Sequence, residues 1–199
     1  PGFFPAPVEP DGSVKRVTNL GWRDKPVKKE LEALTGLATS VENDANVAAL
    51  GEAIYGAGAG CDRVFYMTIG SGIGGGFIIN QQIYHGQLPG EVEIGHIRLN
   101  KQGDTLESAC SGWAINNRVR KFLNENPHSL LAKLDKHQSE PESILLGQAL
   151  AQGDQDAQRM MLEIADDIAF ALSHVVHLFH PEILIIGGGI SLLGDELLI

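Results

Sequence analysis

The sequence is poor in cysteine and has no long apolar run. Its two cysteines, Cys61 and Cys110, stand far apart, which excludes a disulfide framework and a zinc cluster built from closely spaced cysteines. No apolar run approaches the roughly 20 residues of a membrane span, and the first residues lack the basic and apolar regions of a signal peptide. We therefore expect a protein of the reducing cytoplasm without a membrane partner.

Basic residues are also scarce. Lysine and arginine number 15 against 25 aspartates and glutamates, so the formal net charge is −10. Such an acidic chain disfavours general binding to nucleic acid or to anionic membranes. A bound nucleotide would have to be held locally, by backbone amides and a metal ion. With 43% hydrophobic and 20% charged residues, the composition is otherwise that of an ordinary globular protein.

Glycine, in contrast, is concentrated in the segment 70–76, between strand-like runs at 64–67 and 77–79. Backbone amides in such a hairpin tip can converge on an anion, and the hydroxyls of Thr68 and Ser71 can add donors. The segment lacks the Gly-Lys-Ser/Thr end of a Walker loop, and no helix follows it as in a dinucleotide-binding fold. The alternative interpretation is a flexible or bulged hairpin tip.

Hydrophobic periodicity predicts a mixed α/β protein. Asp24 and Gly36 are the expected N-terminal cap and stop of the first helix, and the glycine-alanine stretch 56–60 is an expected hinge. The last strand runs into Gly187-Gly188-Gly189, which predicts a fully buried strand whose tip meets a ligand or another backbone. Strands are expected at 14–18, 37–41, 64–67, 77–79 and 183–186, and helices at 25–34, 45–55, 109–122 and 156–179.

Asp44 stands where a predicted strand passes into a predicted helix, a position at which α/β folds present catalytic side chains. Asn43 or Asp44 could instead simply cap the helix. In the functional interpretation, Asp44 is the general base that takes a proton from an alcohol as the alcohol attacks phosphorus. Asn43 would then orient neighbouring hydroxyls.

Glu93, His96 and Glu107 have the chemistry to bind a polyol, since carboxylates and an imidazole can hydrogen-bond vicinal hydroxyls. The alternatives are a solvated charged loop for Glu91 and Glu93, and a hydrogen-bonded packing residue for His96. A zinc site at His96 would need about four ligands, usually including closely spaced cysteines, and only Cys110 is near. We expect no zinc.

In this order, the segments resemble the sugar kinases of the ROK family (repressors, open reading frames, kinases), within the superfamily of sugar kinases, heat-shock protein 70 and actin. Asn-Leu-Gly-Trp at 19–22 is similar to a family segment, and Asn-Asp-Ala-Asn at 43–46 resembles the motif that bears the catalytic aspartate. The stretch 68–76 resembles the second phosphate motif, 90–96 the Glu-x-Gly-His sugar-binding signature, and 181–189 the adenosine motif. Each motif is weak alone, but together in family order they are specific.

The resemblance implies an actin-like ATPase (ribonuclease H-like) fold of two lobes, with the remainder of the N-terminal lobe at 1–59 and most of the C-terminal lobe at 60–199. It implies ATP and Mg²⁺ as cofactors and Asp44 as the catalytic base. It also implies sugar ligands at Asn43, Glu93, His96 and Glu107, and nucleotide contacts at Thr68, Gly70, Ser71, Gly72, Gly187 and Gly188.

The chain departs from the family pattern in two places. Many members carry a Cys-x-Cys-Gly-x-x-Gly-Cys zinc loop after the Gly-His, whereas the interval 97–106 has no cysteine here. The first phosphate motif, Asp-x-Gly-Gly-Thr, should precede Pro1, which with Gly2 resembles the end of the family's Val-Pro-Gly turn. The chain also stops at Ile199, inside an expected amphipathic helix. We therefore expect a piece cut at both ends that is not a competent kinase alone.

The function implied by the resemblance is ATP-dependent phosphorylation of a hexose, glucose foremost, at its 6-hydroxyl. Lobe closure around the hinge at 56–60 would exclude water. Hexose and ATP are the expected partners, nucleic acid is not expected for this part of the chain, and a homodimer is a family expectation. The alternatives are a sugar-responsive repressor with a DNA-binding domain upstream of Pro1, and a sugar-binding module that has lost catalysis.

Overall fold

The computed structural model describes residues 2–4, 6–17, 20–87, 89–134 and 141–193. Pro1 and Asn19 of the resemblance, and the expected terminal helix ending at Ile199, lie outside this part. The chain divides into two compact units, which are described separately. The expected lobe boundary between residues 59 and 60 stays a prediction. The first unit holds residues 1–67, 74–93 and 181–185, and the second holds 68–73, 94–180 and 186–199.

The first unit begins with short strands around a helix. β1 (Gly2–Phe4) and β4 (Val41–Asn43) pair in parallel, whereas β2 (Val14–Val17) and β3 (Trp22–Lys25) pair antiparallel. Helix α1 (Val27–Thr35) follows β3. A small apolar core holds these elements together, and its members are Ala6, Val14, Val17, Val27 and Val41.

Two local predictions need correction in this region. The N-cap of α1 is Pro26 rather than Asp24, because Asp24 belongs to β3 and has a positive φ of 46°. The strand expected at 37–41 is β4, and it begins only at Val41 because its pairing with β1 starts there. The predicted stop of α1 is confirmed, since Gly36 caps the helix in the left-handed conformation with a φ of 68°.

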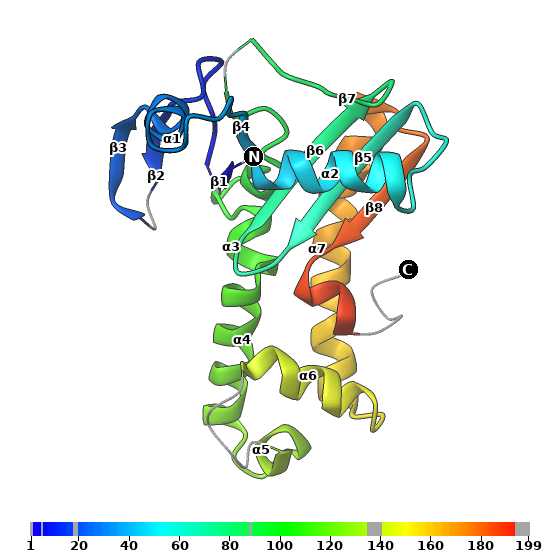
Figure 1. Cartoon of the computed structure of the whole chain (residues 1–199). Helices are drawn as coiled ribbons and strands as arrows, with labels where there is room; N and C mark the ends of the chain where they lie inside the picture. Colours follow the sequence, from blue (N-terminus) through cyan, green and yellow to red (C-terminus); the bar gives the residue numbers. More distant parts are fainter. Residues whose placement is uncertain (1, 5, 18–19, 88, 135–140, 194–199) are drawn as a thin grey trace. The chain divides into compact units, whose positions relative to one another are not determined.

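The main sheet has the strand order β7-β6-β5-β8. Its strands are β5 (Arg63–Ile69), β6 (Ile73–Ile79), β7 (Gln82–Ile83) and β8 (Ile183–Gly187), and Figure 1 shows β5 and β6 as the predicted hairpin. The expectation that the last strand is fully buried is wrong: every residue of β8 is half-buried, because β8 lies at the edge of the described sheet. A hydrogen bond joins the starts of β8 and β5: the amide of Asp62, just before β5, donates to Oε2 of Glu182, just before β8, at 2.6 Å.

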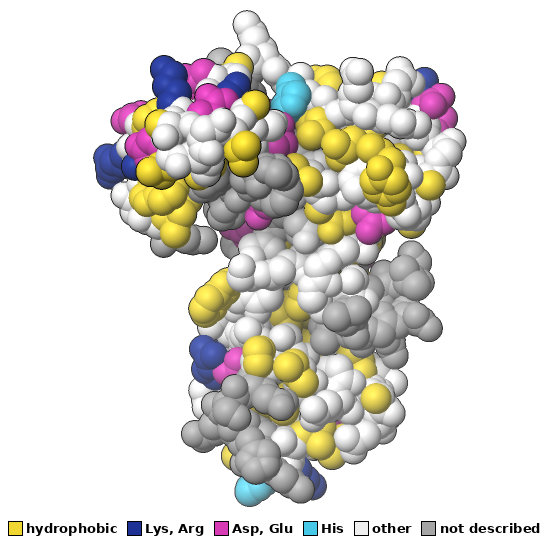
Figure 2. Space-filling view, in the orientation of Figure 1, with side chains coloured by type: hydrophobic (Ala, Val, Ile, Leu, Met, Phe, Trp, Pro, Cys, Tyr) yellow, Lys and Arg dark blue, Asp and Glu magenta, His cyan; other side chains and the backbone are white. Residues whose placement is uncertain are grey.

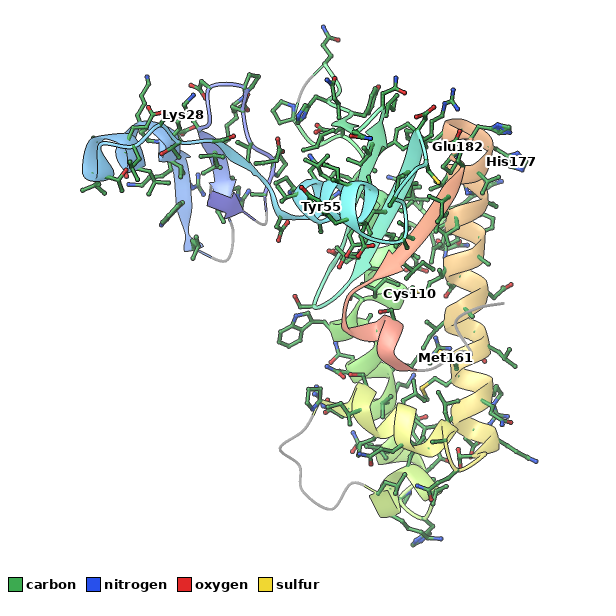
Figure 3. The ribbon with its side chains drawn as sticks, turned by 45° about the vertical axis from the view of Figure 1, so that its right-hand side comes forward. Lys28, Tyr55, Cys110, Met161, His177 and Glu182 are labelled. Atoms are coloured by element: carbon green, nitrogen blue, oxygen red, sulfur yellow. The ribbon has the colours of Figure 1, made fainter. Side chains whose placement is uncertain are left out.

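Helix α2 (Asp44–Tyr55), shown in cyan in Figure 1, lies directly on β6. The contact is possible because Gly76 has no side chain: a Cβ there would come 2.7 Å from the Ala49 Cβ and 3.2 Å from the Ala45 carbonyl oxygen. Figure 2 shows hydrophobic side chains over the outer face of α2, and Tyr55 at its end, labelled in Figure 3, is 89% exposed. The core under the helix contains Ala49, Ala53, Val64, Tyr66 and Ile78.

The second unit is mainly helical. Where the sequence predicted one helix over 109–122, the structure has two, α3 (Leu106–Cys110) and α4 (Gly112–Glu125). Ser111 separates them because it ends α3 and its hydroxyl caps α4 by accepting from the Ala114 amide at 3.2 Å. The remaining elements are η2 (Ile94–His96), α5 (Leu130–Leu134), α6 (Glu142–Leu150), α7 (Gln155–Phe179) and η3 (Gly189–Leu193).

The predicted long helix is confirmed as α7, and its apolar stripe forms the core of the second unit. α6 packs against both α4 and α7, as Figure 1 shows. Cys110 of α3 and Met161 of α7, both labelled in Figure 3, are buried, and the Cys110 Sγ lies 3.7 Å from the Ile164 carbonyl oxygen of α7. None of the described helices combines the length and the apolar character needed to cross a bilayer. The buried residues of α7 are Ala157, Met160, Met161, Ile164, Ala165, Ile168, Ala171 and Val175.

Candidate functional site

The predicted catalytic carboxylate is accessible at the start of α2. Asp44 is the first residue of the helix and is exposed, and its Oδ1 accepts a hydrogen bond of 2.9 Å from the Ala45 amide. Asn43 is the N-cap: its Oδ1 accepts from the Asn46 amide at 3.1 Å, and its Nδ2 donates to the Ala6 carbonyl at 3.3 Å. The capping alternative therefore holds for Asn43, while the Asp44 side chain remains open to a ligand.

A buried amide lies one turn into the same helix. Asn46 is 4% exposed, and its Nδ2 donates to Oε1 of Glu42 and to Oε1 of Glu91, at 3.2 Å each. Glu42 Oε1 also accepts from the Asn43 amide at 2.8 Å. The Asn46 Oδ1 has no hydrogen-bond partner among the residues that the structure describes, and it lies against Gly76. The Asn46 side-chain amide thus joins the carboxylates of Glu42 and Glu91. These two residues are 49 positions apart in the sequence, and only folding brings them together.

His85 completes this cluster from the surface. Its Nδ1 lies 2.9 Å from Glu91 Oε1, and its Nε2 lies 3.4 Å from Glu42 Oε2. A doubly protonated imidazole would donate to both carboxylates, whereas a neutral ring has a single N–H. The three side chains line a cavity of about 490 Å³, to which Lys28, labelled in Figure 3, also contributes.

Glu91 is therefore not the solvated surface charge that the loop composition suggested as an alternative. Its side chain is only 10% exposed, because Asn46 and His85 cover it. Glu93, the predicted sugar ligand, follows two residues later and is half-buried. Both glutamates belong to the first unit, together with Asn43 and Asp44.

The tip of the glycine hairpin, residues 68–73, belongs to the second unit, and a backbone hydrogen bond closes its turn. The Gly70 amide donates to the Gly72 carbonyl at 2.9 Å. Within the described ranges, no hydrogen bond engages the amides of Ser71 and Gly72, so both can donate to an anion. Thr68 and Ser71 bring hydroxyls to the same segment, and Ser71 is exposed.

Two glycines from distant segments brace this tip by close backbone contact. A Cβ added at Gly188 would lie 2.4 Å from the Ile69 carbonyl oxygen, and one at Gly112 would lie 2.7 Å from the Gly70 carbonyl oxygen. The Gly112 amide also donates to that Gly70 oxygen at 2.8 Å. The prediction that the tip of β8 meets a ligand or another backbone is met by the backbone contact. The hairpin is thus a supported turn.

The remaining predicted sugar ligands lie in the second unit, next to the hairpin. Glu107, in the first turn of α3, accepts a hydrogen bond of 2.8 Å from the Ile73 amide through Oε2. A Cβ at Gly72 would come 2.7 Å from this oxygen. His96 is exposed at the end of η2, and its neighbour Gly95 packs so tightly that a Cβ would lie 2.4 Å from the Ile73 carbonyl oxygen.

The cysteine-free interval after His96 is closed by hydrogen bonds. Leu106 donates to the Ile97 carbonyl at 2.9 Å, and Leu99 donates to the Asp104 carbonyl at 2.8 Å. At the tip, Asn100 Nδ2 donates to Asp104 Oδ2 at 2.7 Å, and Asn100 Oδ1 accepts from the Asp104 amide at 3.2 Å. In the described part of the chain, no group of three or more His, Cys, Asp and Glu residues is arranged to hold a metal ion. The absence of zinc stays a prediction.

Comparison with known proteins identifies the family. The model of the ROK family matches residues 3–198. The chain belongs to the ROK family. Glucokinase from Halalkalibacterium halodurans is 36% identical over 213 residues, a match that covers all of this chain and 62% of the glucokinase. The expected actin-like ATPase fold of the α/β class is confirmed by the ROK sugar kinases among the structural neighbours.

One of those structures is a ROK family glucokinase from Streptomyces griseus in complex with glucose and AMPPNP, with a TM-score of 0.83 and 34% identity, covering 98% of this chain and 66% of that one. The xylose repressor of Caldicellulosiruptor bescii is 26% identical and matches 92% of this chain and 48% of its own length. The ROK chain described here therefore spans less than two thirds of these relatives, and the family includes both kinases and repressors.

The sequence did not predict the residues that support the site. The residues that it did predict are those implied to bind ligands. His85 and Gly112 belong to no motif of the resemblance, and Glu42 and Asn46 entered only as neighbours of Asp44. The one available signal was the pair of polar residues, Glu42 and Asn46, at i and i+4 around the start of an apolar helix. Nothing local in the sequence pairs either of them with Glu91.

Proposed function

We propose that the full-length protein containing this chain transfers a phosphoryl group from ATP to the 6-hydroxyl of a hexose, with glucose foremost. The observation that carries the proposal is the exposed carboxylate of Asp44 at the first position of α2. Support comes from the family, in which glucokinases match at 34–36% identity over 88–100% of this chain.

In the proposed reaction, Asp44 accepts the proton of the attacking 6-hydroxyl, which becomes more nucleophilic as its O–H bond weakens. Asn43 contributes through the second lone pair of its Oδ1, since the helix cap uses only one. The other hydroxyls of the sugar are bound by Glu93, His96 and Glu107. This set offers both acceptors and a donor, as a ring of vicinal hydroxyls requires.

The hairpin tip fits the phosphates of ATP. The amides of Ser71 and Gly72 supply donors, and the hydroxyls of Thr68 and Ser71 add more. Space is also present, because a Cβ at Gly70 would meet nothing within 4 Å. Gly187 and Gly188 are proposed to border the adenosine. Mg²⁺ would accompany ATP, held mainly by phosphate oxygens and water, and would neutralise part of the phosphate charge.

The test uses the full-length protein with a panel of glucose, mannose, fructose and N-acetylglucosamine in an assay coupled to ADP release. Asp44→Asn should lower kcat by about 10²–10⁴ because the general base is lost. Sugar binding, measured by calorimetry, should be largely retained. Asp62→Asn is the matched control, since Asp62 is also exposed and has no part in the site. Near-normal turnover by Asp44→Asn would sink the assignment.

The repressor is the second candidate, supported by the match to the xylose repressor. The kinase is favoured because the glucokinase match is both more similar and more complete. The residues encoded upstream of Pro1 decide between them: an Asp-x-Gly-Gly-Thr motif supports the kinase, and a helix-turn-helix supports the repressor.

Two further expectations belong to this proposal. A homodimer is supported by exposed apolar side chains on α7, among them Phe170 and Leu178, and light scattering on the full-length protein tests it. A cytoplasmic location is supported by the free cysteines Cys61 and Cys110, and fractionation of cells tests it.

A further inference from the structure

The loop that leads to Glu93 contains a backbone conformation that its sequence does not favour. Val92 has a φ of 57°, in the left-handed region. A β-branched residue rarely adopts this conformation, because its Cβ substituents crowd the backbone. A residue kept there must be held by its surroundings, and such strained positions often orient functional groups.

The neighbour of Val92 supplies the hold. Glu91 is nearly buried, and a single oxygen, Oε1, accepts from the Asn46 side chain at 3.2 Å and lies 2.9 Å from His85 Nδ1. Asn46 is itself buried, with 4% of its surface exposed, and belongs to α2. Glu91 is therefore bound to α2, the helix that carries Asp44. Its partner there, Asn46, is two residues after Asp44 in the helix.

Glu42 strengthens the arrangement from the other side. It accepts from the same Asn46 amide group and from the Asn43 backbone, and its second oxygen lies 3.4 Å from His85 Nε2. The Asn46 side chain and His85 thus each bridge the two carboxylates. We call these four residues, Glu42, Asn46, His85 and Glu91, the carboxylate clamp.

We propose that Glu91 is a positioning residue: through the carboxylate clamp it holds Val92 in the left-handed conformation and so aims Glu93 relative to Asp44 on α2. All of these residues belong to the first unit. The proposal rests on the proposed function only in taking Glu93 as a sugar ligand. The clamp itself is a matter of loop structure and can be tested without any substrate.

The first test measures loop order in the full-length protein by the rate of chymotryptic cleavage after Tyr84. Glu91→Ala should raise this rate at least tenfold, because both hydrogen-bond partners of Oε1 are lost. Glu91→Gln should restore most of the protection, since its amide oxygen can still accept from Asn46. Gln87→Ala is the matched control, because Gln87 is exposed in the same loop. Equal rates for Glu91→Ala and Gln87→Ala would overturn the proposal.

The second test measures the KM for the sugar and for ATP. Glu91→Ala should raise the sugar KM about tenfold, with the ATP KM within twofold of wild type and with recovery in Glu91→Gln. An unchanged sugar KM, or equal rises for both substrates, contradicts the positioning role. If the wild-type protein neither binds nor phosphorylates any sugar, the proposed function fails, and the cleavage rates alone decide whether the carboxylate clamp exists.

Val92→Gly gives an independent measure of the strain. Glycine adopts a positive φ without crowding, and the relief of this crowding should offset the larger entropy that glycine loses on folding, so the melting temperature should not fall. The variant should also leave the sugar KM near the wild-type value while Glu91 is present. A lower melting temperature would show that the strain at Val92 is smaller than the entropy that glycine loses on folding, and it would contradict the proposal.

Discussion

The amide of Ile73 donates a hydrogen bond of 2.8 Å to Oε2 of Glu107. The bond joins the end of the glycine hairpin to the first turn of α3, within the second unit. Glu107 is a predicted sugar ligand, whereas the hairpin is predicted to bind phosphate. The Glu107 carboxylate is therefore predicted to bind the sugar, and it also supports the hairpin that is predicted to bind the phosphates of ATP.

Glu107→Ala should affect both substrates of the full-length protein. The Ile73 amide, in a residue that is 4% exposed, would lose its acceptor, at a cost of about 1–3 kcal/mol in the free energy of unfolding. The KM for ATP should rise together with the KM for the sugar. Glu107→Gln keeps an acceptor oxygen and should restore the ATP KM more than the sugar KM. An ATP KM that stays at its wild-type value in Glu107→Ala would contradict this expectation, and Glu125→Ala on α4 serves as the control.

Gly188→Ala should destabilise the second unit. The residue has a φ of 91°, and the new Cβ would lie 2.4 Å from the Ile69 carbonyl oxygen. We expect a loss of about 1–3 kcal/mol or more in the free energy of unfolding, measured by urea denaturation. Gly189→Ala is the matched control, because its Cβ would meet nothing within 4 Å, and it should change stability by about 0.5 kcal/mol or less. Similar losses in both variants would disprove the close-contact explanation.

The loop between His96 and α3 should be stable without metal. Asn100 and Asp104 close it by side-chain and backbone hydrogen bonds. Treatment with EDTA and dialysis should leave the melting temperature of the full-length protein unchanged, and its sugar KM should also be unchanged once Mg²⁺ is returned with ATP for the assay. Asp104→Ala should instead raise the sugar KM, because the loop that follows His96 loosens. A melting temperature that falls on chelation and recovers with zinc would show that a metal is required.

The two thiols should differ strongly in reactivity. Burial, reinforced by the nearby Asp167, raises the pKa of the Cys110 thiol from 9.0 to about 12, so almost no reactive thiolate forms at neutral pH. Cys61 is only half-buried and should react first with a maleimide. Mass spectrometry of the partly labelled folded protein checks this order. Labelling of Cys110 at the rate of Cys61 would mean that the α3–α7 contact opens readily.

The same shift makes stability fall at alkaline pH. Well below pH 9 the Cys110 thiol is protonated in both folded and unfolded chains, and it has no effect on the pH dependence. As the pH rises from 9 toward 12, the unfolded chain loses the proton first, so the free energy of unfolding decreases. Cys110→Ala should remove this part of the decrease, measured by urea denaturation at several pH values, although it also leaves a small cavity.

Elements with strong local patterns could be predicted from the sequence. The stripe of α7 and the apolar runs on both sides of the hairpin have the periods of a helix and of strands, and both predictions are confirmed. Boundaries set by pairing were less accurate. β4 begins at Val41 because β1 pairs with it there, and Asp24 lies in β3 because of its partner β2.

The supporting contacts of the site could not be predicted, because they join distant segments. Glu91 lies 45 residues from Asn46, and Glu107 lies 34 residues from Ile73. Motifs indicate which residue types a reaction needs, and on that basis Asp44 and the hairpin are predicted to belong to the site. They do not indicate which side chain a buried amide such as that of Asn46 will meet, since that depends on how the whole sheet and its helices pack.

The contact between Gly76 and α2 limits how the protein can be redesigned. The height of α2 above β6 is set by the Ala49 methyl group, the Asn46 Oδ1 and the Ala45 carbonyl oxygen, which all lie close to Gly76. Any larger residue at these positions would lift the helix and displace Asp44 with it. Altered sugar preference should therefore be sought at exposed loop residues outside the carboxylate clamp, such as Gln87, where a side chain can change while the helix keeps its place.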